Sequence, residues 1–258
     1  MEAPQKRHRT IMASEALSAI AVILHNSIRQ YKPQHSKVLP LTGDPFAAAH
    51  TGTVFAFRDK PRMTAARGIA VRPPEALWEN EDRLTHWTPN PYRYGKRLPG
   101  GLVSGFSEDN LLALNTFMID IDFPTRAARD KYAQNHDIWW DTIIDGDILA
   151  TLIIKTDKGY QAFYVLDQAA YVRRNARGVL PVVNSAKMIA HNLKEALAKR
   201  LPQVDLGAND FGITRIPRND NIVWFEPKLT HRFSDLQRWS IRYSRQKHAS
   251  KGLSAHKL

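Results

Sequence analysis

The segment Asn115-Thr-Phe-Met-Ile-Asp-Ile-Asp122 is an apolar, β-rich run that ends in two aspartates one residue apart. Because successive side chains on a strand point to opposite faces, Asp120 and Asp122 are predicted to share one face while the apolar side chains pack into a core. Two carboxylates held this close repel each other, and a divalent cation relieves the repulsion. Oxygen ligands suit Mg²⁺ or Mn²⁺, so the segment indicates phosphoryl or nucleotidyl transfer. The alternative is that the pair only ends a strand at a solvated turn.

The composition narrows the chemistry and the partner. The chain has 258 residues, of which 43% are hydrophobic, enough for one large domain or two small ones. It contains no cysteine, which excludes disulfides, thiolate zinc sites and thiol nucleophiles and fits a reducing cytosol. Its formal charge of +12 points to a polyanion, and the six tryptophans and eight tyrosines favour nucleic acid, whose bases stack on aromatic rings, over a membrane surface. No apolar stretch is long enough to span a bilayer, so we expect a cytoplasmic protein.

The sequence predicts a basic arm with an amphipathic helix and a loop over residues 1–50, and a basic tail over residues 241–258. The predicted main domain lies between them, over residues 51–240. No acidic residue follows Asp235, and this defines the tail.

Hydrophobic periodicity predicts strands at 53–57, 69–71, 151–155, 160–166 and 222–225, and helices at 13–30, 125–138, 185–201 and 233–243. Ser107 and Ser185 are predicted to cap helices, the first of which runs to about Leu114. The connection from 156 to 159 is short and contains a glycine, so its flanking strands form an antiparallel hairpin, with Lys155 and Gln161 near each other at its mouth. A hairpin among irregularly alternating elements predicts the α+β class.

A proline-rich loop from Leu84 to Gly95 carries large rings and basic groups. Loops of this kind often bind ligands, so we consider four of its side chains as candidates for nucleic-acid binding, namely His86, Trp87, Arg93 and Tyr94. The alternative is a structural loop packed by its own aromatic rings.

Three motifs occur in order along the chain: Asp120-Ile-Asp122, Lys155-Thr-Asp-Lys-Gly-Tyr-Gln161, and Val204-Asp205 followed by Arg215-Ile-Pro217. This ordered set resembles the motifs of the archaeo-eukaryotic primase superfamily. The resemblance implies a catalytic unit over residues 111–240, an RRM-like, mostly antiparallel sheet flanked by helices. This unit would be joined to a smaller N-terminal α/β unit over residues 51–110.

Longer strings narrow the resemblance over about residues 50 to 240: Thr85-His-Trp-Thr-Pro-Asn90, Tyr92-Arg-Tyr-Gly95, Leu152-Ile-Ile-Lys155, Asp157-Lys-Gly-Tyr-Gln-Ala162 and Arg215-Ile-Pro-Arg218. They closely resemble the theta-type plasmid replication initiators of Gram-positive bacteria, the RepE/RepS/RepR group. The resemblance implies a role in starting plasmid DNA replication. Members of this group are longer, so the chain is either a catalytic-domain fragment or a short member.

The resemblance assigns roles by position. Asp120, Asp122 and Asp205 would be the catalytic metal ligands for Mg²⁺ or Mn²⁺, with Asp210 as the competitor for the third role. Triphosphate or template phosphate would be bound by Lys155, Lys158, Gln161, Arg215 and Arg218. Gln161 departs from the superfamily, where the second motif usually ends in histidine, and a glutamine cannot carry a proton at pH 7.

The leading hypothesis is therefore an initiator that binds origin or single-stranded DNA and nucleoside triphosphates at a primase-polymerase-like site. The alternative is a non-catalytic DNA-binding initiator that retains the primase fold and recruits host replication proteins. A nicking initiator and a P-loop helicase rank below both, because the chain lacks His-x-His and Gly-x-x-x-x-Gly-Lys-Ser/Thr. The choice between NTP and dNTP, the origin sequence and the oligomeric state stay open.

Overall fold

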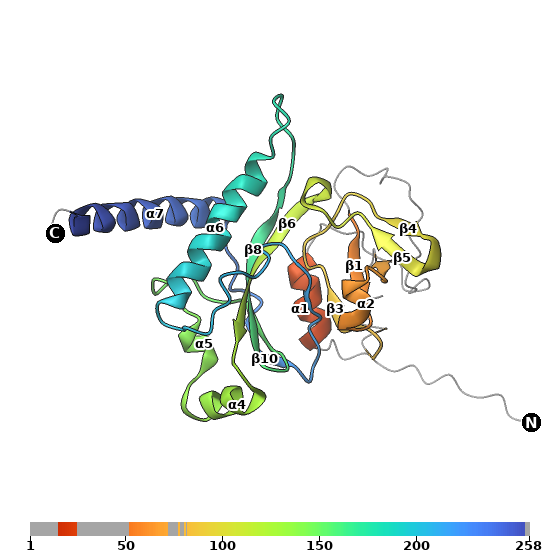
Figure 1. Cartoon of the computed structure of the whole chain (residues 1–258), viewed down its shortest axis with the longest axis horizontal. Helices are drawn as coiled ribbons and strands as arrows, with labels where there is room; N and C mark the ends of the chain where they lie inside the picture. The colour runs from red at the N-terminus through yellow and green to blue at the C-terminus, as the bar shows by residue number, and fades with distance from the viewer. Residues whose placement is uncertain (1–14, 25–51, 72–76, 78–79, 81, 256–258) are drawn as a thin grey trace, which may run out of the picture.

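The computed structural model describes residues 15–24, 52–71, 77, 80 and 82–255. Helices and antiparallel sheets alternate along the chain (Figure 1), so the predicted α+β class is confirmed. The basic arm and the loop predicted within residues 1–50 lie outside the described residues. Of the amphipathic helix predicted there, the structure describes α1 (Glu15–Leu24).

The central sheet has the strand order β10-β7-β8-β6, and every neighbouring pair is antiparallel. Its strands are β6 (Ala113–Asp122), β7 (Leu152–Lys155), β8 (Gly159–Tyr171) and β10 (Ile222–Phe225). The predicted hairpin is the β7–β8 pair, and it is confirmed. The described part of the protein has two hydrophobic cores. Alternation of side chains along β6 places Phe117, Ile119 and Ile121 in one of them and Met118 in the other.

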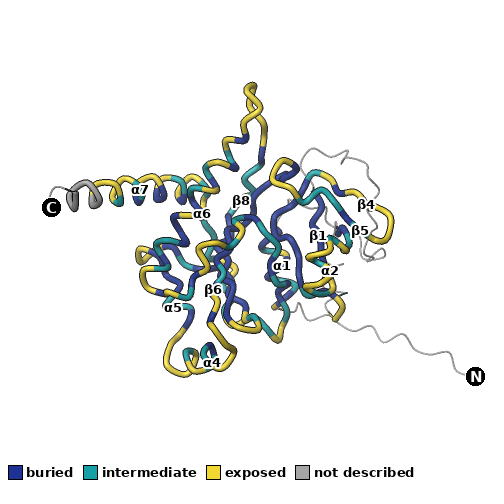
Figure 2. Tube along the Cα trace, viewed as in Figure 1, coloured by how far each residue is buried: buried dark blue, intermediate teal, exposed yellow. Residues whose placement is uncertain are grey.

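Helices cover both faces of this sheet. The Phe117 face packs against α6 (Pro181–Ala198), which lies beside α7 (Phe233–Ala255), and α1 contacts the opposite face. Figure 1 shows α7 extending away from the body of the protein, while Figure 2 shows that the deepest burial follows the strands. Because Asp120 alternates with Ile119 and Ile121, its side chain lies on the face of the sheet opposite α6.

A second sheet has the order β2-β1-β3-β9 and is also antiparallel. Its strands are β1 (Val54–Phe57), β2 (Ile69–Val71), β3 (His86–Trp87) and β9 (Thr214–Arg215). The short helix α2 (Lys60–Thr64) follows β1, and a small ribbon of β4 (Lys96–Leu98) and β5 (Leu102–Ser104) completes this region. β9 comes from far along the chain, so the third motif completes the sheet that the N-terminal segment begins.

The remaining local predictions have mixed outcomes. Thr125 caps α4 (Arg126–Asn135) through the Ala128 N–H, and the short helix α5 (Ile138–Asp141) follows. The Ser185 cap is wrong: α6 begins at Pro181, because proline has no N–H to satisfy and its φ suits a first helical position.

The helix predicted after Ser107 is also wrong. Only a 3₁₀ turn forms, over Glu108–Asn110, without a side-chain cap, because the chain turns into β6 at Ala113. In the C-terminal region, α7 continues beyond residue 243 to Ala255, so most of the segment predicted as a basic tail is helical.

Candidate active site

The two aspartates of the first motif lie at the end of β6, opposite the start of β8. In the strand register Asp120 pairs with Gln161 and Asp122 with Gly159. A Cβ on Gly159 would lie only 1.7 Å from the Ile121 carbonyl oxygen, so no larger residue fits there. The glycine of the second motif therefore lets the two strands approach closely beside the carboxylates.

Asp205 joins them from the other side of β6. A bridge between Ile121 and Val204 continues the ladder, and the Asp205 N–H donates to the Asp120 carbonyl oxygen at 2.9 Å. Directly opposed residues of an antiparallel pair share a face, so Asp120, Asp122 and Asp205 project to the same side. The Asp205 carboxylate also accepts the Gly207 N–H at 2.8 Å.

Asp210, the competitor for the third role, faces elsewhere. Its carboxylate lies 2.7 Å from the ammonium group of Lys194, which is only 5% exposed. A buried lysine needs a compensating anion, so Asp210 is committed to an ion pair with α6. The geometry favours Asp205 as the third carboxylate.

Burial, the neighbouring charges and one hydrogen bond determine the pKa of the Asp120 carboxyl. Burial raises the pKa of its carboxyl to about 6, and the neighbouring Asp122 and, more weakly, Asp205 act in the same direction. A hydrogen bond from Gln161 opposes the rise. The same glutamine accepts the Arg215 N–H at 2.8 Å through Oε1, which leaves its amide to donate to Asp120.

The carboxylates fit a hard divalent cation by their chemistry. Like charges on one face repel each other and a cation relieves the repulsion, and all three side chains offer oxygen. Among the described residues, no three acidic or histidine side chains lie close enough to form a ready-made metal site. The paired carboxylates Asp120 and Asp122 are therefore the best-formed part of the predicted ligand set.

A hollow of about 430 Å³ opens in front of the two aspartates and is rimmed by cations. Lys158 and Arg215, both predicted phosphate ligands, line it together with Gln161. Lys60 from α2 lines it as well; from sequence, the basic connection that contains it is either a phosphate-contacting loop or a solvated hairpin end. The signal for it is that Lys60 follows a buried strand in a segment rich in arginine.

Two predicted phosphate ligands lie elsewhere. Lys155 pairs with Tyr160, one position along from Gln161, so it projects to the opposite face, where its ammonium lies 3.7 Å from Asp130. The expected proximity of Lys155 to Gln161 is wrong because neighbouring positions on a strand alternate faces. Arg218 forms an ion pair with Asp220 at 3.0 Å and does not line the hollow.

The proline-rich loop contributes one side chain to the hollow. His86 lines it, and burial with the nearby Arg215 and Lys60 charges lowers the pKa of its imidazole to about 4. The Thr85 hydroxyl donates to the Arg58 carbonyl and lies 2.7 Å from His86 Nδ1. That hydroxyl must then accept from Nδ1–H, which leaves Nε2 as a hydrogen-bond acceptor.

The other three candidates of this loop differ in exposure. Trp87 is fully buried, and its indole N–H donates to the Arg215 carbonyl, so this ring packs inside the protein as the structural alternative expected. Arg93 donates to the carbonyls of Leu111 and Val172, a structural role that uses its guanidinium inside the fold. Tyr94 is 37% exposed and keeps its predicted access to a ligand.

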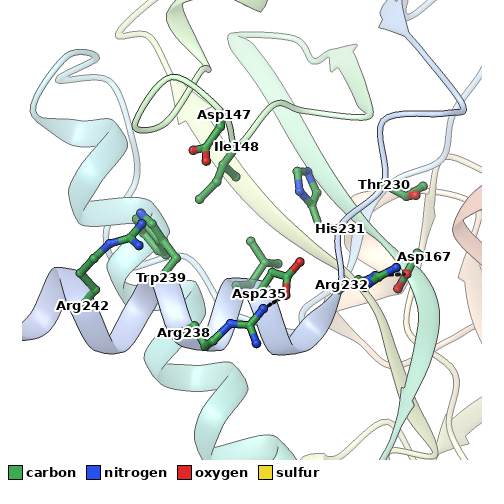
Figure 3. Close-up of a pocket in the computed structure, with 11 residues that line it drawn as sticks. Asp147, Ile148, Asp167, Thr230, His231, Arg232, Asp235, Arg238, Trp239 and Arg242 are labelled. Atoms are coloured by element: carbon green, nitrogen blue, oxygen red, sulfur yellow. Dashed lines mark hydrogen bonds and ion pairs between the residues drawn. The ribbon is translucent and has the colours of Figure 1, made fainter.

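A separate hollow of about 450 Å³ lies where α7 meets the central sheet (Figure 3). Figure 3 shows Asp235 beside Arg238 and Asp167 beside Arg232, two ion pairs with separations of 2.5 and 3.7 Å. Three aspartates and three arginines line it, so its charges balance. Three aspartates and three cations also line the hollow beside Asp120, but there Asp120 and Asp122 lie together at the end of β6.

No protein-family model matches the chain. Two solved structures are similar to the chain in fold. The AEP domain of the cyanophage S-2L primase-polymerase is 9% identical, with 74% of this chain and 89% of that chain covered and a TM-score of 0.38. The polymerase domain of Mycobacterium tuberculosis Ligase D in complex with DNA is 12% identical, with 88% of this chain and 86% of that chain covered and a TM-score of 0.33.

In sequence, Protein RepS of Streptococcus pyogenes and Protein RepR of Streptococcus agalactiae are each 40% identical over 230 residues, which cover 88% of this chain and 45% of the relative. A replication initiation protein of Bacillus anthracis is 36% identical over 242 residues, covering 87% of this chain and 45% of the relative. The chain thus spans less than half the length of these relatives. No helix in the described part of the chain is long and apolar enough to cross a membrane. Over 88% of its length the chain is therefore homologous to the RepS and RepR proteins, which confirms the group predicted from its motifs.

Proposed function

We propose that the chain is the part of a cytoplasmic plasmid replication initiation protein that binds single-stranded DNA and nucleoside triphosphates and carries out metal-dependent nucleotidyl transfer. The observation that carries the proposal is a pair of carboxylates, Asp120 and Asp122, that lines a hollow rimmed by Lys60, Lys158 and Arg215. Asp205 projects to the same side and lines a neighbouring hollow that Asp120 also lines. Carboxylates next to cations suit a ligand that is both anionic and metal-bound, as a nucleoside triphosphate is.

The three carboxylates would hold Mg²⁺ or Mn²⁺. When bound, the ions supply activation of the attacking hydroxyl and stabilisation of the pyrophosphate leaving group. With a pKa of about 6, Asp120 is mostly ionised at pH 7.5 and able to act as a ligand. Gln161 positions it, because its amide is held between the Arg215 backbone and the Asp120 carboxylate.

The cations at the rim bind the phosphates of the incoming nucleotide. Lys60 and Lys158 are exposed and can reach a charged ligand, and Arg215 is half-buried at the edge of the second sheet. A lysine acts as a point charge, whereas an arginine can form two parallel hydrogen bonds to one phosphate. Neutral His86 offers Nε2 as an acceptor for a hydroxyl group of the sugar or for water.

A second hollow of about 480 Å³ adjoins the first, and Asp120, Met63 and Ile213 line both. Its other lining includes the aromatic rings of Tyr92, Phe106 and Phe211. Apolar and aromatic walls suit a sugar and a base, so we assign the polar hollow to the triphosphate and the aromatic one to the nucleoside.

The test is incorporation of labelled nucleotide on single-stranded DNA with Mg²⁺ or Mn²⁺, in wild type and in Asp120→Asn, Asp205→Asn and Asp210→Asn variants. We expect the first two substitutions to abolish incorporation and the third to retain it, since Asp210 serves Lys194 instead. Loss in Asp210→Asn with retention in Asp205→Asn would exchange their roles. DNA affinity should also fall steeply with salt, because bound cationic side chains displace counterions.

One observation favours a second candidate function, a non-catalytic initiator that binds DNA and recruits host replication proteins. Gln161 stands where the superfamily usually has histidine, and both ends of its amide are occupied by hydrogen bonds within the protein. It therefore cannot transfer a proton to a nucleotide. Absence of incorporation by the wild type, with DNA binding intact, would select this candidate.

A further inference from the structure

A hollow of about 520 Å³ lies on another side of α2, and four arginines line it: Arg58, Arg62, Arg67 and Arg83. The rest of its described lining is glycine, aliphatic side chains and one asparagine, without an acidic residue. It shares no lining residue with the hollow beside Asp120. On α2, Lys60 and Met63 are three residues apart and line the active-site hollow, while Arg62 lines this one.

The arginines are held by local structure. The Asp59 carboxylate caps α2 by accepting the Arg62 N–H at 2.7 Å and also accepts the Arg62 guanidinium at 2.6 Å. Beyond α2 the chain reverses through Ala66, whose φ of +54° lies in the left-handed region, at a cost of about 1–2 kcal/mol for a residue other than glycine. Hydrogen bonds on both sides maintain this turn, from the Arg67 N–H to the Arg62 carbonyl at 2.8 Å and from the Val103 N–H to the Ala66 carbonyl at 2.7 Å.

The charge of this hollow is not balanced by its surroundings. Arg62 has Asp59 at 2.6 Å and Arg83 has Asp82 at 3.7 Å, while Arg58 and Arg67 form no ion pair within the described part of the chain. An arginine cannot lose its proton near neutral pH, so a bound anion would relieve the repulsion that remains among the four. The hollow at α7 differs, because three aspartates there oppose three arginines (Figure 3).

We propose that this arginine hollow binds a phosphate group of the polynucleotide strand whose neighbouring part occupies the site beside Asp120. Guanidinium forks match phosphate oxygens in geometry, and all four arginines are exposed, so they can reach a long chain that lies on the surface. The short helix α2 separates the two hollows and presents cations to both, which allows one strand to contact them in succession. The inference rests on the DNA-binding part of the proposed function.

The test compares an Arg58→Gln/Arg67→Gln variant with an Arg173→Gln/Arg177→Gln control. Both double substitutions remove the same charge, and the control arginines are exposed in the loop between β8 and α6. Binding of fluorescent oligodeoxythymidine is measured by anisotropy in EDTA at several salt concentrations, so the result does not depend on catalysis. Binding of free dTTP with Mn²⁺ is measured by calorimetry, and urea unfolding verifies that each variant is folded.

We expect the Arg58→Gln/Arg67→Gln variant to bind the oligonucleotide about tenfold more weakly than the control does. The slope of log affinity against log salt should also decrease in magnitude by about 1.4, since each lost phosphate contact on a single strand contributes about 0.7. Its dTTP affinity should equal that of the control.

Equal oligonucleotide affinity in variant and control would overturn the inference while leaving the proposed function intact. Loss of dTTP binding alone would overturn it as well, because the hollow would then be a site for free nucleotide. Absence of oligonucleotide binding by the wild type would refute the DNA-binding part of the proposed function itself.

Discussion

Replacing Asp120 by asparagine should make the folded protein more stable at neutral pH while it removes the proposed metal site. Burial is the main reason why the pKa of this carboxyl rises to about 6, and repulsion from Asp122 adds to it. Each pKa unit corresponds to about 1.4 kcal/mol, so ionising Asp120 in the folded state costs on the order of 3 kcal/mol. The side chain is partly accessible, and we therefore expect a gain of about 1–3 kcal/mol in the free energy of unfolding.

The pH dependence of this gain has a definite sign. Because the folded pKa of Asp120 is raised above its ordinary value of 3.8, the folded wild type binds more protons than the unfolded chain between about pH 4 and pH 6. This contribution to wild-type stability therefore falls as pH rises through that window and is level above it. The advantage of Asp120→Asn should be largest above pH 6 and should shrink towards pH 4.

The assay is urea unfolding in EDTA, followed by tryptophan fluorescence, at several pH values. Asp157→Asn is the matched control, since Asp157 lines the same hollow but is exposed, and we expect no comparable gain. Adding Mn²⁺ should then stabilise the wild type more than Asp120→Asn, because only the former keeps the full carboxylate set. An Asp120→Asn variant that is equally or less stable at pH 7.5 would refute the electrostatic reasoning.

Three further predictions concern residues around this site. Gln161→Leu leaves the Arg215 N–H without its acceptor, so the free energy of unfolding should fall by about 1–3 kcal/mol in denaturant titration, and an unchanged value would mean that water replaces the amide. Asp210→Asn removes the partner of a buried lysine and should destabilise the fold by about 2–4 kcal/mol at pH 7, as measured by urea unfolding, whereas no loss would show that the pair contributes nothing. Gly159→Ala places a Cβ 1.7 Å from the Ile121 carbonyl oxygen and should cost more than about 3 kcal/mol by the same titration; a well-folded variant would contradict the close approach of the two strands.

The sequence determined the features that depend on local pattern. Alternation along β6 placed Asp120 and Asp122 on one face and the intervening apolar residues in the core, and the short glycine-containing connection predicted the β7–β8 hairpin. The helix capped by Thr125 also follows from its own residues. Such features need only a periodicity of two or a cap, and both can be read within a few neighbouring residues.

Tertiary structure decided which distant groups meet. Pairing of β9 with β3 brings Arg215 and His86 to the same hollow, although they are far apart along the chain. Trp87 was expected to contact nucleic acid because it is a large ring in a loop, but it fills the core of the protein. Composition alone does not distinguish an aromatic ring that stacks on bases from one that packs inside.

For charged side chains too, the sequence does not show which face of a strand or which hollow they reach. Lys155 and Gln161 belong to one motif, yet strand register sends them to opposite faces, while Lys60 reaches the active-site hollow from a helix outside all three motifs. The sequence by itself determined the type of chemistry, since residue types and their order along the chain define the motifs. Only the tertiary structure decided the membership of the site and the raised pKa of Asp120, because burial and contacts across strands arise when distant segments pack together.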